Sequence, residues 1–236
     1  PCVALLRRAR AALGDGLTGF EVMEQFSLQL VGRHFLQLAQ PFPSAPWTVL
    51  LEFAARTEEE AQQRLEALLA DALQEGLIGD AAVASSLAQA RALWHLRESI
   101  PLAQAEEGLN IKNDISLPVS AIPDFVRATG DALRAALPGI RLVTFGHLGD
   151  GNLHYNVQAP EGQPAADFLR RHEPAVNALV YDAVQACGGS FSAEHGIGAL
   201  KRDELARRKS PVALGLMRSM KAALDPLGTL NPGRVI

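Results

Sequence analysis

Two histidines on a short hairpin are the residues in this sequence best suited to bind a metal ion. Residues 146–154 read GHLGDGNLH, and the Asp-Gly pair at 150–151 is a strong signal for a tight hairpin turn. If Asp150 and Gly151 are the central turn residues, His147 lies directly opposite His154. Opposed residues share one face of a sheet, with Cβ atoms about 4.5–5.5 Å apart, so both imidazoles could bind one ion such as zinc.

A second glycine-rich segment, residues 192–198 (SAEHGIG), places a carboxylate beside an imidazole. Such groups are costly to keep without partners, so we expect Glu194 to complete the metal site of His147 and His154. Neighbours in an extended chain project in different directions, which leaves His195 to act as a base beside the metal. The alternatives are that Glu194 and His195 only cap the next helix and that the hairpin histidines are ordinary surface residues.

Two basic residues could bind a substrate carboxylate. Arg97, in WHLRES, suits bidentate carboxylate recognition, and Lys112, in NIKND, can add a point charge. Taken alone, each is better explained as a solvated surface charge. Asn156 lies two residues beyond His154 and therefore shares its face. The other histidines fall in helical stretches with no companion motif: His34, His95 and His172.

The elements that must position these residues follow from hydrophobic period, turn residues and caps. We expect helices over residues 3–13, 27–38, 57–74, 85–99, 120–137, 165–186, from about 198, and 211–224. We expect strands over residues 17–23, 47–54, 109–117, 140–147, 153–158 and 190–193, with 47–54 buried. Thr57 before three glutamates is a strong helix start, and Ser120 is expected to cap another helix.

This order of elements predicts an α+β fold. Strands and helices do not alternate regularly, so a mainly antiparallel, ferredoxin-like sheet with helices on one face fits best. We expect a sheet-bearing substrate and metal region over about 17–195 and a helical C-terminal portion over about 196–236.

Composition excludes several classes of protein. The 236 residues are 48% hydrophobic and 20% charged with a net charge of −4, values typical of a globular protein. No basic run with interleaved aromatics indicates nucleic-acid binding, no apolar stretch spans a bilayer, and no secretory signal opens the chain. Two distant cysteines and an excess of arginine over lysine indicate reduced thiols in the cytoplasm of a bacterium.

Five motifs together resemble one family. GHLGDGNLHYNV, SAEHGIG, LDPLGTLNPGRV, LRESIP and IKNDISLPV resemble the C-terminal domain of FAD-linked oxidases of the vanillyl-alcohol-oxidase type. Within that group the chain is similar to the D-2-hydroxyglutarate, D-lactate and glycolate dehydrogenase branch, over nearly its whole length. The resemblance implies oxidation of a small 2-hydroxyacid with FAD as cofactor.

The resemblance also implies roles for individual residues. The metal ligands would be His147, His154 and Glu194, the catalytic base His195, the substrate contacts Arg97, Lys112 and Asn156, and the residue near the flavin Asn231. One departure concerns position 101, where D-2-hydroxyglutarate enzymes carry threonine and this chain has Pro101. Proline has no hydroxyl to donate, so hydroxyglutarate itself is not favoured as the substrate.

The family implies a partner as well. FAD is expected to be held mostly by an N-terminal domain, and the start at Pro1 indicates that this chain is a fragment without it. The helical C-terminal portion is expected to pack toward that domain, and a homodimer is left open. Two alternative functions remain: a metal-dependent hydrolase built on the same His, His and Glu, and a non-catalytic metal-binding module.

Overall fold

A computed structural model describes all 236 residues of the chain. The chain divides into two compact units, Pro1–Phe191 and Ser192–Ile236, and each is described by itself. No helix of the structure combines the length and the apolar character that crossing a membrane requires. Both cysteines are free thiols.

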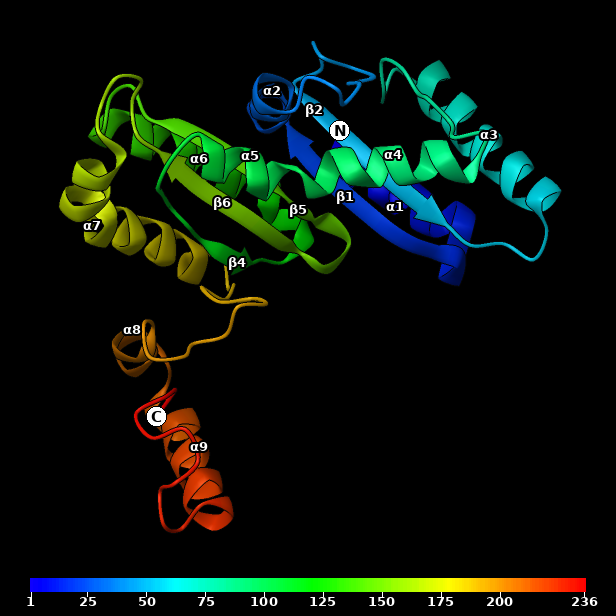
Figure 1. Cartoon of the computed structure of the whole chain (residues 1–236). Helices are drawn as coiled ribbons and strands as arrows, with labels where there is room; N and C mark the ends of the chain where they lie inside the picture. Colours follow the sequence, from blue (N-terminus) through cyan, green and yellow to red (C-terminus); the bar gives the residue numbers. More distant parts are fainter. The chain divides into compact units, whose positions relative to one another are not determined.

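The first unit is built on one six-stranded sheet (Figure 1). Its strands are β1 (Leu17–Glu24), β2 (Trp47–Phe53), β3 (Asn110–Ile111), β4 (Asp114–Ser116), β5 (Arg141–His147) and β6 (Asn152–Gln158). They lie in the order β2-β1-β5-β6-β3, with β4 also paired to β6, and every pairing is antiparallel. The predicted α+β class with a mainly antiparallel sheet is confirmed.

Seven helices accompany this sheet, and they lie on both of its faces. They are α1 (Cys2–Leu13), α2 (Gln25–His34), α3 (Glu58–Gln74), α4 (Leu87–Glu98), α5 (Ile100–Glu106), α6 (Ile122–Ala136) and α7 (Ala165–Ala186). Leu142 of β5 packs in a core with residues of α1, α3, α6 and α7, whereas Val143 packs in another with residues of α2, α4 and α5. The prediction that helices cover only one face of the sheet was therefore wrong, because β1 and β5 carry apolar residues on both faces.

Local signals account for most element boundaries. The Thr57 hydroxyl accepts a hydrogen bond from the Glu60 backbone N–H at 3.1 Å, and α3 begins at Glu58 as its cap predicts. The expected buried strand at 47–54 is instead the edge strand β2, and most of its residues are only half-buried. The expected strand 109–117 is interrupted at Lys112–Asn113, between β3 and β4.

The helix expected over residues 85–99 is α4, which ends at Glu98, and Pro101 occupies the first turn of the next helix, α5, where its missing N–H costs nothing. Two other boundaries differ from expectation. Ser120 lies in a 3-10 turn, and α6 begins at Ile122 without a side-chain cap. The expected strand 190–193 is reduced to a single bridge between Ser190 and Ser116.

One carboxylate ties α2, α5 and β5 together. Glu107, at the end of α5, accepts hydrogen bonds from Arg33 and from His34, each at 2.9 Å, and from Arg141. Burial raises the pKa of Glu107. The opposite effect is larger and comes from the hydrogen bonds of His34 and Arg141 and the charges of Arg141 and Arg33, so the pKa lies below its ordinary value.

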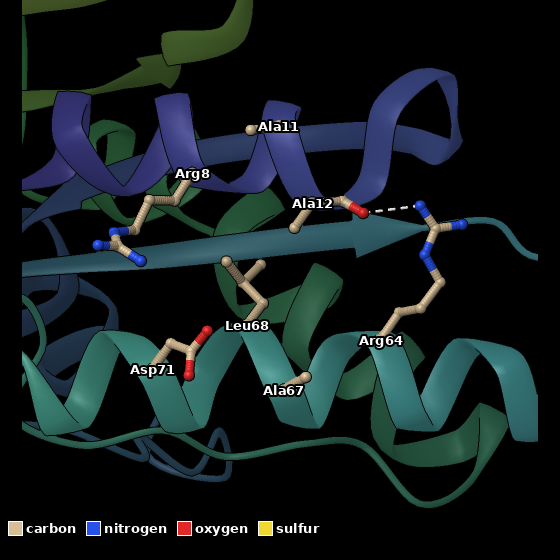
Figure 2. A pocket seen from close by; sticks show the side chains of 7 residues that line it. All are labelled: Arg8, Ala11, Ala12, Arg64, Ala67, Leu68 and Asp71. Atoms are coloured by element: carbon tan, nitrogen blue, oxygen red, sulfur yellow. Dashed lines mark hydrogen bonds between the residues drawn. The ribbon is translucent and has the colours of Figure 1, made fainter.

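A hollow of about 400 Å³ lies between α1 and α3 (Figure 2). Its lining includes Arg8, Arg64 and Asp71 beside three alanines and a leucine. The Arg8 side chain pairs with Glu75, and Arg64 donates to the Ala12 carbonyl at 2.7 Å. The hollow contains none of the residues predicted to bind metal or substrate.

The second unit contains α8 (Arg202–Arg208), α9 (Pro211–Leu224) and an irregular tail. The expected helix from about residue 198 thus begins four residues later. Asp225 organises the tail by accepting hydrogen bonds from Lys221 and from the N–H groups of Thr229 and Leu230. These donors, Lys221 first, lower the pKa of Asp225 to about 2.

Candidate metal and substrate site

The two hairpin histidines lie on the same face of the sheet, although they are not directly opposed. His154 pairs with Phe145, because a 3-10 turn at Leu148–Asp150 makes the connection longer than a two-residue turn. The displacement is two residues, and a shift of two leaves every side chain on its original face. The two rings meet edge to face with centroids 6.3 Å apart, and ring nitrogens of the pair lie within 4.8 Å.

The loop between the histidines depends on Gly151. Its φ of 74° lies in the left-handed region, and a Cβ there would stand 2.2 Å from the Leu117 carbonyl oxygen. The Leu117 N–H donates to the Gly151 carbonyl at 2.9 Å. The Asp-Gly signal was therefore correct about the turn and wrong about its length.

Glu21 of β1 lies opposite His147 and joins it to Arg97. One carboxylate oxygen accepts from His147 Nδ1 at 2.5 Å and the other from Arg97 Nε at 2.8 Å. The side chain is almost fully buried, which raises its pKa. The hydrogen bond from His147 and the charge and hydrogen bond of Arg97 lower it, so the pKa of Glu21 lies below its ordinary value overall.

Arg97 is buried beside the histidine face, with 6% of its surface exposed. Its guanidinium carbon lies 4.7 Å from the centre of the Phe145 ring, a cation–π arrangement. The reading of Arg97 as a solvated surface charge was therefore wrong. Lys112, in contrast, is exposed at the interruption between β3 and β4.

His154 also has a carboxylate neighbour. Asp114 lies opposite it in β4, with Oδ1 4.0 Å from His154 Nδ1. The same carboxylate oxygen accepts from the Asn152 side chain at 2.9 Å, which fixes its orientation. Carboxylates behind histidine ligands orient the rings and raise their basicity in metal sites, so the histidine pair and its surroundings fit a divalent transition ion.

Asn156 continues the same face beyond His154. Its carbonyl oxygen accepts the Asn113 backbone N–H at 3.0 Å, and its amide donates to Gln104 at 3.0 Å. All three residues are buried, and the side-chain amide of Asn113 and the amide nitrogen of Gln104 have no hydrogen-bond partner. A strongly polar interior therefore adjoins the histidines.

Glu194, His195 and Asn231 belong to the second unit, so their placement relative to the histidine pair stays a prediction. Both Glu194 and His195 are exposed in a segment where the Ser192 hydroxyl donates to the Gly196 carbonyl at 2.7 Å. The next helix, α8, has Lys201 at its N-cap position. Neither Glu194 nor His195 is therefore the N-cap residue of α8.

Sequence reasoning missed Glu21 and Asp114. Each is a buried carboxylate within a strand, LTGFEVME for β1 and DIS for β4. A charge at such a position is costly unless it is paired, and this was the available signal.

Comparison with known proteins places the chain in a family. Residues 1–235 match FAD linked oxidases, C-terminal domain, and the chain belongs to this family. It is 36% identical over 237 residues to D-2-hydroxyglutarate dehydrogenase, mitochondrial, of Arabidopsis thaliana, covering 100% of this chain and 41% of that protein.

Two other relatives carry similar names. D-2-hydroxyglutarate dehydrogenase, mitochondrial, of Bos taurus is 40% identical over 232 residues, 98% of this chain and 41% of that protein. D-2-hydroxyglutarate dehydrogenase of Stutzerimonas stutzeri (strain A1501) is 37% identical over 221 residues, 93% of this chain and 47% of that protein. The chain thus spans less than half the length of the curated relatives it matches.

Proposed function

We propose that this chain is the substrate-binding part of a flavin-dependent dehydrogenase that oxidises a D-2-hydroxyacid to the 2-oxoacid. The observation that carries the proposal is the hydrogen-bonded row Arg97–Glu21–His147 beside His154, in which Arg97 and Glu21 are buried. This row places a carboxylate-binding cation next to two imidazoles on one face of the sheet. Membership of the FAD linked oxidase family and the names of the relatives support it.

In this proposal His147, His154 and Glu194 hold a divalent ion, with zinc the first choice. Glu21 can only accept, so Nδ1 of the neutral His147 ring carries the proton and Nε2 carries the lone pair that a metal requires. When bound, such an ion supplies Lewis-acid chemistry that lowers the pKa of the substrate hydroxyl.

The chain's own residues position the substrate and move its proton. Arg97 keeps both terminal guanidinium nitrogens for the substrate carboxylate, because only its Nε donates to Glu21. Lys112 adds a second positive charge, and Asn156 contacts the substrate on the histidine face. His195 accepts the proton of the C2 hydroxyl as general base while the hydride leaves C2.

FAD supplies the hydride acceptor when it is bound, and we propose that a domain outside this chain holds it, with Asn231 at the edge of the flavin site.

An exposed apolar stripe in the second unit supports the proposal of a separate FAD-binding domain. Val212, Leu216, Met220 and Leu224 follow one another at four-residue spacing along α9, and each is 59–81% exposed. An exposed apolar stripe of this kind marks an interaction surface. We propose the FAD-binding domain as its occupant, with a second copy of this chain as the alternative.

The proposed substrate is the class of D-2-hydroxyacids and not hydroxyglutarate in particular. Ser99 alone separates α4 from α5, and its backbone is itself helical, so Pro101 lies about one turn beyond Arg97. A hydroxyl at this position could bind a second carboxylate, and Pro101 has none.

The proposal is tested on the full-length protein with a panel of D- and L-2-hydroxyacids and an artificial electron acceptor. We expect dye reduction with one or more D-acids and none with their L-enantiomers. Hydrolysis of ester or phosphate substrates without any dye reduction would instead support a metal-dependent hydrolase.

A further inference from the structure

We infer that Glu21 is a positioning residue that couples carboxylate binding at Arg97 to metal binding at His147. The inference rests on the proposed function, because it assigns Glu21 a role in that same site. Glu21 lies on β1, next to β5 in the sheet, and only 2% of its surface is exposed.

Each carboxylate oxygen of Glu21 accepts from a different partner. Oε1 accepts the Nδ1 proton of His147 at 2.5 Å, which selects the tautomer with its lone pair on Nε2. Oε2 accepts from Arg97 Nε at 2.8 Å, which orients the guanidinium and leaves its terminal nitrogens to bind a carboxylate. One carboxylate therefore fixes both the tautomer of the His147 ring and the orientation of the Arg97 guanidinium.

Burial makes the coupling strong. A buried arginine without a counter-charge is strongly unfavourable. Glu21 supplies the counter-charge that keeps Arg97 in place beside the Phe145 ring. Glutamine at position 21 has one acceptor oxygen where two donors converge, so it can satisfy only His147 or Arg97. The inference therefore predicts that one substitution weakens both metal binding and substrate binding.

The same strand offers a matched control. Glu24 lies three residues further along β1, so alternation places it on the opposite face of the sheet, near Thr144. Burial raises the pKa of Glu24, and glutamine is close to this side chain in size and shape. Glu24→Gln removes a carboxylate from β1 without touching the histidines or Arg97.

The experiment compares Glu21→Gln and Glu24→Gln in the full-length protein. Zinc affinity is measured on metal-stripped protein by competition with a chromophoric chelator, and KM and kcat are measured with the D-2-hydroxyacid that the wild type oxidises. We expect Glu21→Gln to weaken zinc binding about 10–100-fold and to raise KM more than it lowers kcat. Glu24→Gln should match the wild type in both measurements.

Zinc affinity of Glu21→Gln equal to that of Glu24→Gln would overturn the inference. The zinc measurement needs no turnover, so it decides the role of Glu21 even if the wild type oxidises no hydroxyacid. Should Glu21→Gln fail to fold, long-range proton–nitrogen NMR spectra of the metal-free wild type read the His147 tautomer directly. A proton on Nδ1 supports the inference, and a neutral ring with its proton on Nε2 overturns it.

Discussion

Gly151→Ala tests whether the loop between the two histidines is built as described. Alanine at the observed φ of 74° costs roughly 1–2 kcal/mol, because left-handed backbone crowds its Cβ. The new Cβ would stand 2.2 Å from the Leu117 oxygen, so the strand must move and its hydrogen bond to residue 151 is lost, at about 1 kcal/mol. The free energy of unfolding should therefore fall by roughly 2–3 kcal/mol.

Gly149→Ala in the same loop is the matched control. Its Cβ would have only the Phe20 Cβ within 4 Å, at 3.9 Å, and its φ lies outside the left-handed region, so the cost should stay within about 0.5 kcal/mol. Urea denaturation followed by near-ultraviolet circular dichroism measures both variants. Thermal melting should show a drop of roughly 5–10 °C for Gly151→Ala alone, given the size of the first unit. Equal stabilities for the two variants would refute the reasoning.

Three further predictions concern single side chains. Burial raises the pKa of Glu107, but the cationic partners of this carboxylate bring it below 4.5. The stability that Glu107 contributes is therefore present above that pH and lost as the pH falls. Glu107→Gln should cost about 2 kcal/mol at pH 7 in urea denaturation, and a cost unchanged at pH 3 would contradict this. Pro101→Thr should raise kcat/KM for D-2-hydroxyglutarate relative to D-lactate by about tenfold, and an unchanged ratio would remove position 101 from specificity. Arg97→Lys keeps the positive charge but loses the two-pronged guanidinium, so KM should rise by about tenfold with a smaller change in kcat. An unchanged KM would argue against carboxylate binding by Arg97.

Much of the fold could be predicted because local rules decide it. The limits of α7 and α9 coincide with the expected 165–186 and 211–224, and Thr57 caps α3 as its type and position indicate. The division of 109–117 into β3 and β4 could not be predicted. It depends on the Asn156 side chain, which binds the Asn113 N–H from a distant strand.

The shared face of the two hairpin histidines could be predicted, but their register could not. The period-two rule placed His147 and His154 on one face, and this survived an error in the turn length because the error was an even number of residues. Glu21 was missed because its partners come from α4 and β5, far away in the sequence. Pairings of this kind follow from tertiary packing, which no local pattern encodes.

We propose that a metal held by His147, His154 and Glu194 takes part in oxidising a D-2-hydroxyacid. The most direct measurement is anaerobic reduction of the bound flavin by that acid in the full-length protein, before and after removal of metal. We expect flavin bleaching to be lost in the stripped protein and to return when zinc is added. Bleaching at an unchanged rate after the metal is removed would contradict it.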